Sequence, residues 1–476
     1  MRTLCTLTCA LMIGFTFRAM ADDPSSNPRP TPLTRPEMKR LLEEMKERTP
    51  RIPLPELSEE EKSPEEDRSR GYESRLRSLY MPYGDGRGGL SFSSGPGQPN
   101  RAPRPGDRRP QDPPDPALTL DYRFKTSLFW IASRTNNCQY CLGHQESKLL
   151  VTGMTEDEIA ALDSDWSQFG PGEQAAFALA RRLTLEPHRL TDADIDAVRQ
   201  HYSDLQILEM VLSVAGNNSI NRWKEGTGVP QSTGGGSFGR RDNTTVAAET
   251  EHSYLTPTSD QYREKPTLVA SIVNSASSSK SIAPTQCVRP PLETRAESER
   301  AIAAARSRRP RLPVTDEAQA REVLGDDAPQ GRLPQWSRLL ANFPIAGRRA
   351  VTGIRTAEEK GDLSPLLRAQ VAWIIARQDR AWYAAGEAQK RLRALGQTDE
   401  QIYALDGDWK DFREADRAMF TVAKKLAASP VVLTDDEVAQ SVKLVGPRDT
   451  VQLISYTTNR ASFDRFTEAA GLPVDE

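Results

Sequence analysis

The sequence predicts an all-α protein that contains two tandem copies of one helical domain. Apolar residues recur at three- and four-residue spacing, and no segment sustains the two-residue alternation of a half-buried strand. Residues 125–230 recur at 368–473 without a gap, at the offset of 243 residues that separates Trp130 from Trp373. A constant register over this length indicates a duplication rather than a solenoid of many short repeats. We expect the two copies to pack as an intramolecular pseudo-dimer.

The first 21 residues have the features of a cleavable signal peptide. Arg2 is a charged n-region, residues 3–17 are apolar, and Ala19-Met20-Ala21 is a small-x-small cleavage site. We expect a cut after Ala21 and a secreted or periplasmic protein without a membrane segment after cleavage. An uncleaved anchor is the alternative.

Residues 22–117 form a region rich in Pro, Gly and Arg that is poorly suited to a core. The spacing of apolar residues predicts short helices over 34–48 and around 76–80. From 81 to 116 we expect an irregular arm.

Residues 118–230 are expected to form the first helical domain. An amphipathic helix should run through Phe124, Leu128 and Ile131 toward Cys138. The signals for later helix ends are Gly153, the capping box from Thr155 to Glu158, Pro171, Thr191, Gly226 and Gly228. Residues 231–332 are a low-complexity linker that carries Cys287, which we expect to be exposed, and residues 333–476 are the second domain.

The two copies differ where sulfur chemistry is possible. The first copy has Cys138, Cys141 and His144, and the second has Ala381, Ala384 and Glu387 at the same positions. The second copy is therefore expected to be a degenerate partner. Trp166 and Trp409 occur in both copies, so packing and capping explain them better than catalysis. The same holds for Arg222 and Arg465, for which we expect a buried ion pair or a helix tie.

The segment Cys138-Gln139-Tyr140-Cys141-Leu142-Gly143-His144 places two thiols and an imidazole on one face of a helix, because residues three apart share a face. A neighbouring His can form the thiolate, and the second thiol can then condense with a sulfenic acid or mixed disulfide on the first. This is the equipment of a two-cysteine peroxide reductase or a disulfide exchanger.

Three other readings of the cysteines remain open. They could form a structural disulfide, although so small a loop gains little chain entropy. They could bind zinc with His144, but this supplies three of four ligands, and His188, His201 and His252 lie in polar surroundings. They could also be two inert buried thiols.

The run from Phe129 to His144, followed by Asn221-Arg222-Trp223 and Gly228-Val229-Pro230, resembles the alkyl hydroperoxidase D / carboxymuconolactone decarboxylase superfamily, in its peroxidase-related branch. The resemblance covers 118–230 and, without the redox motif, about 333–473. It implies an all-helical domain that associates with its own kind. It also implies that Cys138 and Cys141 are the catalytic redox pair, with Cys141 attacking peroxide, Cys138 resolving, and His144 shuttling the proton.

Two positions depart from the family pattern. The usual His position holds Gln145, one residue after His144, and the position of the relay carboxylate holds Thr126. Glu146 is a substitute carboxylate within the segment, although a solvent-facing charge suits it better. The cysteine pair itself argues against lactone decarboxylation.

We therefore expect an exported thiol peroxidase-like oxidoreductase of peroxiredoxin type, with antioxidant activity. Its substrate would be a peroxide or disulfide, an external dithiol would reduce Cys138–Cys141, and no cofactor or metal would be needed. The net charge of −3 produces no global electrostatic field that would attract the protein to nucleic acid. The rival is a non-catalytic binding or scaffold protein with a resting disulfide, or a general thiol-disulfide exchanger.

Overall fold

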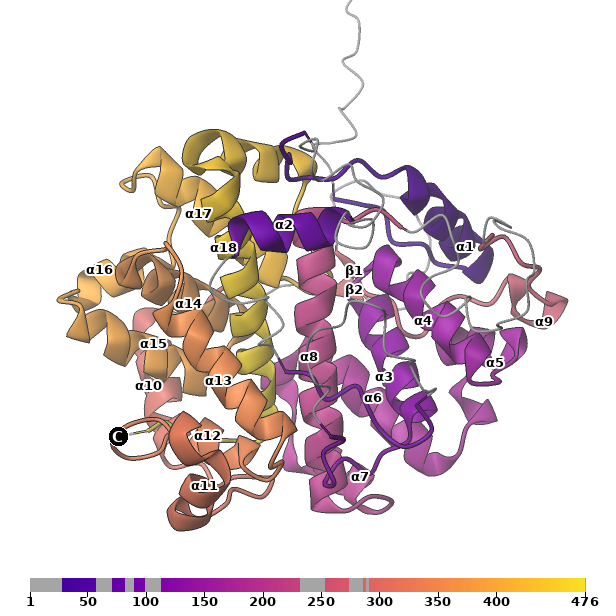
Figure 1. Cartoon of the computed structure of the whole chain (residues 1–476), viewed down its shortest axis with the longest axis horizontal. Helices are drawn as coiled ribbons and strands as arrows, with labels where there is room; N and C mark the ends of the chain where they lie inside the picture. The colour runs from indigo at the N-terminus through magenta and orange to yellow at the C-terminus, as the bar shows by residue number, and fades with distance from the viewer. Residues whose placement is uncertain are drawn as a thin grey trace, which may run out of the picture.

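The computed structural model describes residues 28–56, 71–81, 90–98, 113–231, 253–273, 286–287 and 291–475. Its architecture is all-α, as predicted (Figure 1). A two-residue parallel pair, β1 (Ile272–Val273) and β2 (Gln286–Cys287), is the exception within these ranges. The side chain of Cys287 and the predicted signal peptide lie outside what the structure describes.

The α-helices of the first part of the chain are α1 (Arg35–Glu44), α2 (Tyr72–Tyr80), α3 (Tyr122–Thr135), α4 (Gln139–Val151), α5 (Glu156–Ser164), α6 (Pro171–Leu185), α7 (Asp192–Arg199), α8 (Asp204–Thr227) and α9 (Asp260–Arg263). Those of the second part are α10 (Arg295–Arg306), α11 (Glu317–Leu324), α12 (Gln335–Leu340), α13 (Ala346–Glu359), α14 (Pro365–Asp379), α15 (Trp382–Ala394), α16 (Asp399–Ala404), α17 (Glu414–Ala427) and α18 (Asp435–Ala469). Short 3₁₀ turns are η2 (Met45–Glu47), η4 (Trp166–Gln168), η5 (Pro187–Arg189) and η6 (Gly325–Asp327).

Helix boundaries in the two parts keep the offset of 243. α4 and α15 correspond residue for residue, and α6 and α17 begin at equivalent positions. The predicted caps explain the ends: Thr155 accepts a hydrogen bond from the Glu158 amide at 3.2 Å, and Gly228 closes α8 at φ 68°.

The long helices α8 and α18 pack against each other at the centre of the molecule, with α3 to α7 on one side and α12 to α16 on the other (Figure 1). The contacts across this boundary are reciprocal. Arg222 donates to the Ala427 carbonyl at 2.9 Å, and its counterpart Arg465 donates to the Thr184 carbonyl at 3.1 Å. Thr184 and Ala427 are themselves separated by 243 residues. Both guanidinium groups also reach the Ser429 hydroxyl, at 2.7 and 3.1 Å, so both arginines are the buried ties that the sequence suggested.

The two tryptophans have the packing role expected of them. The indoles of Trp166 and Trp409 donate to the Leu162 and Leu405 carbonyls at 2.8 and 2.7 Å. Each ring also lies edge-on to a phenylalanine.

The described parts of 22–117 contribute more to the core than their composition suggested. Their buried apolar side chains are Met38, Leu42, Met45, Ile52, Leu76, Leu90 and Phe92. All of them except Met45 belong to the main hydrophobic core. Two of the helices that carry them pack on the folded body, because α1 contacts α4 and α2 contacts α18.

A second repeat is visible in the segments that lead into each part. Thr34 to Pro53 aligns with Thr294 to Pro313 at the offset of 260 that separates Arg48 from Arg308. Each segment forms a capped helix and then an extended stretch. The Arg51 and Arg311 amides donate to the Thr227 and Ala470 carbonyls at 3.2 and 2.8 Å, which are again equivalent acceptors.

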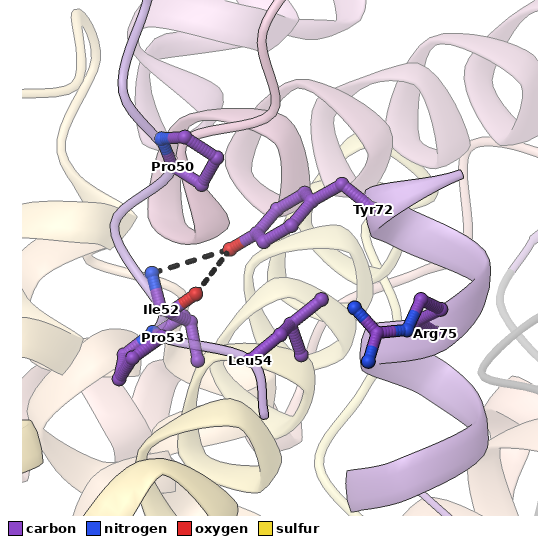
Figure 2. Close-up of a pocket in the computed structure, with 6 residues that line it drawn as sticks. All are labelled: Pro50, Ile52, Pro53, Leu54, Tyr72 and Arg75. Carbon is purple, nitrogen blue, oxygen red and sulfur yellow. Dashed lines mark hydrogen bonds between the residues drawn. The ribbon is translucent and has the colours of Figure 1, made fainter. Parts of the chain in front are cut away.

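An open pocket of about 400 Å³ lies between the extended stretch and α2 (Figure 2). Its lining residues are Pro50, Ile52, Pro53, Leu54, Tyr72 and Arg75. The Tyr72 hydroxyl links the extended stretch to α8. It accepts a hydrogen bond from the Ile52 amide at 3.2 Å, and it lies within donating distance of the Ile52 carbonyl, at 3.2 Å, and of the Thr227 carbonyl, at 2.8 Å. None of the predicted site residues lines this pocket. Among the described helices, none combines the length and apolar character needed to cross a bilayer.

Candidate functional site: the Cys138–Cys141 pair

The turn between α3 and α4 positions the first thiol. Asn137 adopts a left-handed conformation at φ 57°, and Cys138 follows in an extended conformation as the N-cap of α4. Its carbonyl accepts the first helical hydrogen bond, from Leu142, at 3.0 Å. This geometry brings the Cys138 and Cys141 sulfurs to 2.8 Å, and both cysteines are free. The predicted pair is therefore within bonding reach after a small rotation.

Both thiols are buried. Cys138 is 0% exposed and Cys141 2%, and they form a small apolar cluster with Phe129. Burial raises the pKa of the Cys138 thiol well above its usual value, with further contributions from Cys141 and from the charge of Glu225. A helix N-terminus lowers the pKa of a thiol, but at Cys138 the effect of desolvation is larger. Cys138 is thus held as the protonated thiol.

Cys141 lies among cations. Burial lowers the pKa of Lys148 to about 8, against an opposing interaction with Cys141. Lys224, from the end of α8, also interacts electrostatically with Cys141. Its ammonium group lies 4.3 Å from the centre of the Tyr140 ring and pairs with Glu73 of α2. The two sulfurs therefore experience different environments, one beside a carboxylate and the other beside two amines.

His144 lies one turn beyond Cys141, with its ring 4.6 Å from that of Tyr140. Burial, together with the charges of Lys224 and Lys148, lowers the pKa of His144 to about 3. The imidazole is therefore neutral at physiological pH. Its Nε2 is shielded from solvent and has no hydrogen-bond partner in the described part of the chain. No hydrogen bond joins it to either thiol in this conformation.

The two positions considered for a relay carboxylate have other roles. Thr126 donates to the Tyr122 carbonyl at 2.7 Å, within α3. The expectation that Glu146 faces solvent is wrong, because its carboxylate is 5% exposed and pairs with Arg35 at 2.7 Å. The Trp130 indole also donates to it at 2.7 Å. Arg35 lies in the N-terminal segment, so spacing around the cysteines could not reveal this partner.

Two charged residues beside Cys138 escaped the sequence reasoning. Glu225 follows Lys224 at the end of α8, and its carboxylate is 5% exposed. Arg48 lies in the lead-in segment, with its Nη2 atom 3.4 Å from Glu225 Oε2. The signal that could have found Arg48 is the repeat at offset 260. Across the described residues, no group of three or more His, Cys, Asp or Glu side chains is placed to hold a metal ion.

Comparisons with known proteins include a partial match to a bacterial protein. No protein-family model matches the sequence. Over 95 residues the chain is 34% identical to "Uncharacterized protein YdfG" of Bacillus subtilis (strain 168). This similarity covers 19% of the present chain and 62% of that relative, so the chain spans less than two thirds of the protein that it matches.

Proposed function

We propose that the protein is an exported thiol peroxidase in which Cys141 attacks peroxide and Cys138 resolves the product. The observation that carries the proposal is the pair of free sulfurs 2.8 Å apart, of which Cys138 is held protonated while Cys141 lies among Lys148 and Lys224. The thiolate is the nucleophile, and the raised pKa of Cys138 makes this thiol the less suited of the two to form it. The family resemblance of the sequence supports the same assignment.

The reaction has two chemical steps. In the first, the Cys141 thiolate bonds to the terminal peroxide oxygen, the O–O bond breaks, and the departing alkoxide or hydroxide takes a proton. In this proposal that proton is the one lost by the Cys141 thiol, and the neutral imidazole of His144 relays it to the departing oxygen. In the second, Cys138 attacks the Cys141 sulfenic acid, the S–S bond forms, and water leaves. An external dithiol then restores both thiols by exchange.

Burial of both sulfurs bears on substrate choice. A small peroxide can reach a sulfur that is 2% exposed more readily than a bulky one can. We expect hydrogen peroxide to be reduced faster than cumene hydroperoxide.

The test is peroxide consumption by the full chain with dithiothreitol. Cys141→Ser should abolish turnover, and Cys287→Ser is the matched control that should leave it unchanged. Without dithiothreitol, Cys138→Ser should stop after one turnover and accumulate sulfenic acid. Steady turnover by Cys141→Ser would refute the assignment.

The rival function is a binding or scaffold protein with a resting disulfide. The burial of both sulfurs favours it, since a disulfide there would be shielded from reductants. The reduction potential of Cys138–Cys141 separates the two. A value below about −300 mV without peroxide turnover would support the rival.

We further propose that the two halves form a pseudo-dimer within one chain. The reciprocal bonds of Arg222 and Arg465 support this, because equivalent residues meet across a two-fold interface. Removal of 333–476 should leave an aggregated remainder. A soluble monomeric fragment of 118–230 would contradict the proposal.

A further inference from the structure

The two lead-in segments bring an arginine to the same place in each half. Arg48 and Arg308 are equivalent at offset 260, and Glu225 and Glu468 are equivalent at offset 243. In each half the arginine and the glutamate form a pair beside the N-cap of a helix, α4 in the first half and α15 in the second. That N-cap is Cys138 in one half and Ala381 in the other.

In the half with Ala381 the ion pair is closed. Arg308 Nη1 donates to both carboxylate oxygens of Glu468 at 2.9 Å. The Tyr383 amide adds a third hydrogen bond at 3.2 Å. Both carboxylate oxygens of Glu468 are thus hydrogen-bonded, and the role of this pair is structural.

In the half with Cys138 the equivalent pair, Arg48 and Glu225, is less completely hydrogen-bonded. Arg48 Nη2 stands 3.4 Å from Glu225 Oε2, and Arg29 contacts that oxygen at 3.3 Å. Glu225 Oε1, Arg48 Nε and Arg48 Nη1 are buried without a hydrogen-bond partner among the residues described. Leaving buried charged groups unsatisfied is unfavourable, so this opening calls for an explanation.

The charge of Glu225 beside the Cys138 thiol offers an explanation for these unsatisfied groups. Burial alone would raise the pKa of the Glu225 carboxyl, but Arg48, Arg29 and Arg51 and the polar hydrogen of the Cys138 thiol hold it below its usual value. Glu225 in turn contributes to the raised pKa of Cys138. An ionised carboxylate, one oxygen of which is bonded by none of the neighbouring arginines, therefore lies beside a thiol that has yet to lose its proton.

We propose that Glu225 is the proton acceptor of Cys138 and that Arg48 is a positioning residue that keeps this carboxylate ionised. The inference rests on the proposed function for the sulfenic acid step. As Cys138 sulfur bonds to Cys141 sulfur, the S–H proton moves to Glu225 and the S–O bond breaks. The departing hydroxide then takes a proton from Glu225 and leaves as water. On reduction the external dithiol supplies two protons, and Glu225 takes up one of them and passes it to the Cys138 sulfur.

The test is a single-turnover experiment on the full chain with quenching and site-resolved mass spectrometry. Glu225→Gln should react with hydrogen peroxide at Cys141 as fast as wild type. Disulfide formation should be about 100-fold slower, the scale of a lost general base, so that the Cys141 sulfenic acid accumulates and is trapped by dimedone. Glu225→Asp should restore most of the rate.

Glu468→Gln is the matched control. It removes the equivalent, closed pair and should lower the melting temperature without changing the lifetime of the sulfenic acid. If Glu225→Gln behaves like Glu468→Gln, the inference is overturned. If Glu225→Gln does not fold, Glu225→Asp decides alone, since normal sulfenic acid decay combined with a lowered melting temperature would indicate a structural role.

A second arm is independent of peroxide. A small disulfide, 2-hydroxyethyl disulfide, converts Cys141 to a mixed disulfide with release of 2-mercaptoethanol, and Cys138 must resolve this adduct by the same proton loss. The adduct should persist about 100-fold longer in Glu225→Gln than in wild type. If the wild-type protein fails to reduce peroxide, the proposed function is wrong. Persistence of the adduct in Glu225→Gln would still support the role of Glu225, and its rapid loss would overturn that role.

Discussion

The thiol pair and its alanine counterpart occupy nearly identical backbones. Cys138 has φ −85° and ψ 91°, and Ala381 has φ −84° and ψ 90°. The preceding residues, Asn137 and Arg380, are both left-handed, at φ 57° and 53°. The unusual turn that presents the sulfurs is therefore a property of the fold, since it persists where no sulfur is present. What distinguishes the half with the two cysteines is the set of side chains around the turn and the incompletely hydrogen-bonded Arg48–Glu225 pair.

The largest expected effect comes from transferring the thiols to the other half. Ala381→Cys and Ala384→Cys, introduced together in a Cys138→Ser and Cys141→Ser background, should form a disulfide, because the backbone already has the required geometry. Peroxide turnover should stay on the order of 1,000-fold below wild type, because Glu468 is fully bonded and Lys224 has no counterpart there. Thiol titration and peroxide consumption would check both parts. Recovery of turnover would show that the turn alone suffices.

The two tying arginines should differ in their effect on stability. Arg465→Ala leaves Asp379 buried after the loss of a 2.8 Å ion pair, which should cost about 3–5 kcal/mol in the free energy of unfolding. Arg222 bonds neutral oxygens, chiefly carbonyls, so Arg222→Ala should cost less, about 1–3 kcal/mol. Urea denaturation of both variants measures the difference. Equal losses would mean that the carbonyl ties, rather than the ion pair, dominate this interface.

A smaller effect of opposite sign is expected at Asp464. Its counterpart is Asn221, which donates to the Ser133 hydroxyl at 3.0 Å, but Ala376 replaces that serine in the second half. Both Asp464 carboxylate oxygens are left buried without a hydrogen bond in the described structure. Burial raises the pKa of Asp464 well above its usual value, against the opposing charge of Arg460. Asp464→Asn should stabilise the protein by about 1–2 kcal/mol at pH 7.

The pH dependence of that gain follows from the direction of the shift. With a raised pKa, folded Asp464 keeps a proton that the unfolded chain has lost, so its contribution to stability falls as pH rises above about 4. The advantage of Asp464→Asn should therefore shrink toward pH 4 and be largest at neutral pH. Melting temperatures of the two proteins from pH 4 to pH 8 would test this. A difference that does not change with pH would contradict the buried-acid explanation.

Local rules predicted much of the helical framework. Thr155, Pro171 and Gly228 act through their own backbone neighbours, so their positions as helix ends followed from the sequence. The 2.8 Å approach of the two sulfurs likewise follows from three-residue spacing at a helix N-terminus.

Partners from distant segments escaped prediction. The expectation for Glu146 failed because Arg35 reaches it from a lead-in segment that looked unsuited to packing. Arg48 and Glu225 were missed because they belong to repeats with different offsets. The lead-in segment of Arg48 repeats at 260 residues and the helical body of Glu225 at 243, so a search at one offset finds only one of these two repeats. A single sequence gives spacing within an element, but the charge that a distant loop delivers depends on tertiary packing.

The reciprocal hydrogen bonds of Arg222 to Ala427 and of Arg465 to Thr184 join two halves that belong to one polypeptide. Such an association does not depend on protein concentration, because the tether keeps the local concentration of each half constant. A protein released into a large external volume would keep its interface at any dilution. Activity per molecule should accordingly remain constant down to nanomolar amounts, where a pair of separate subunits would come apart.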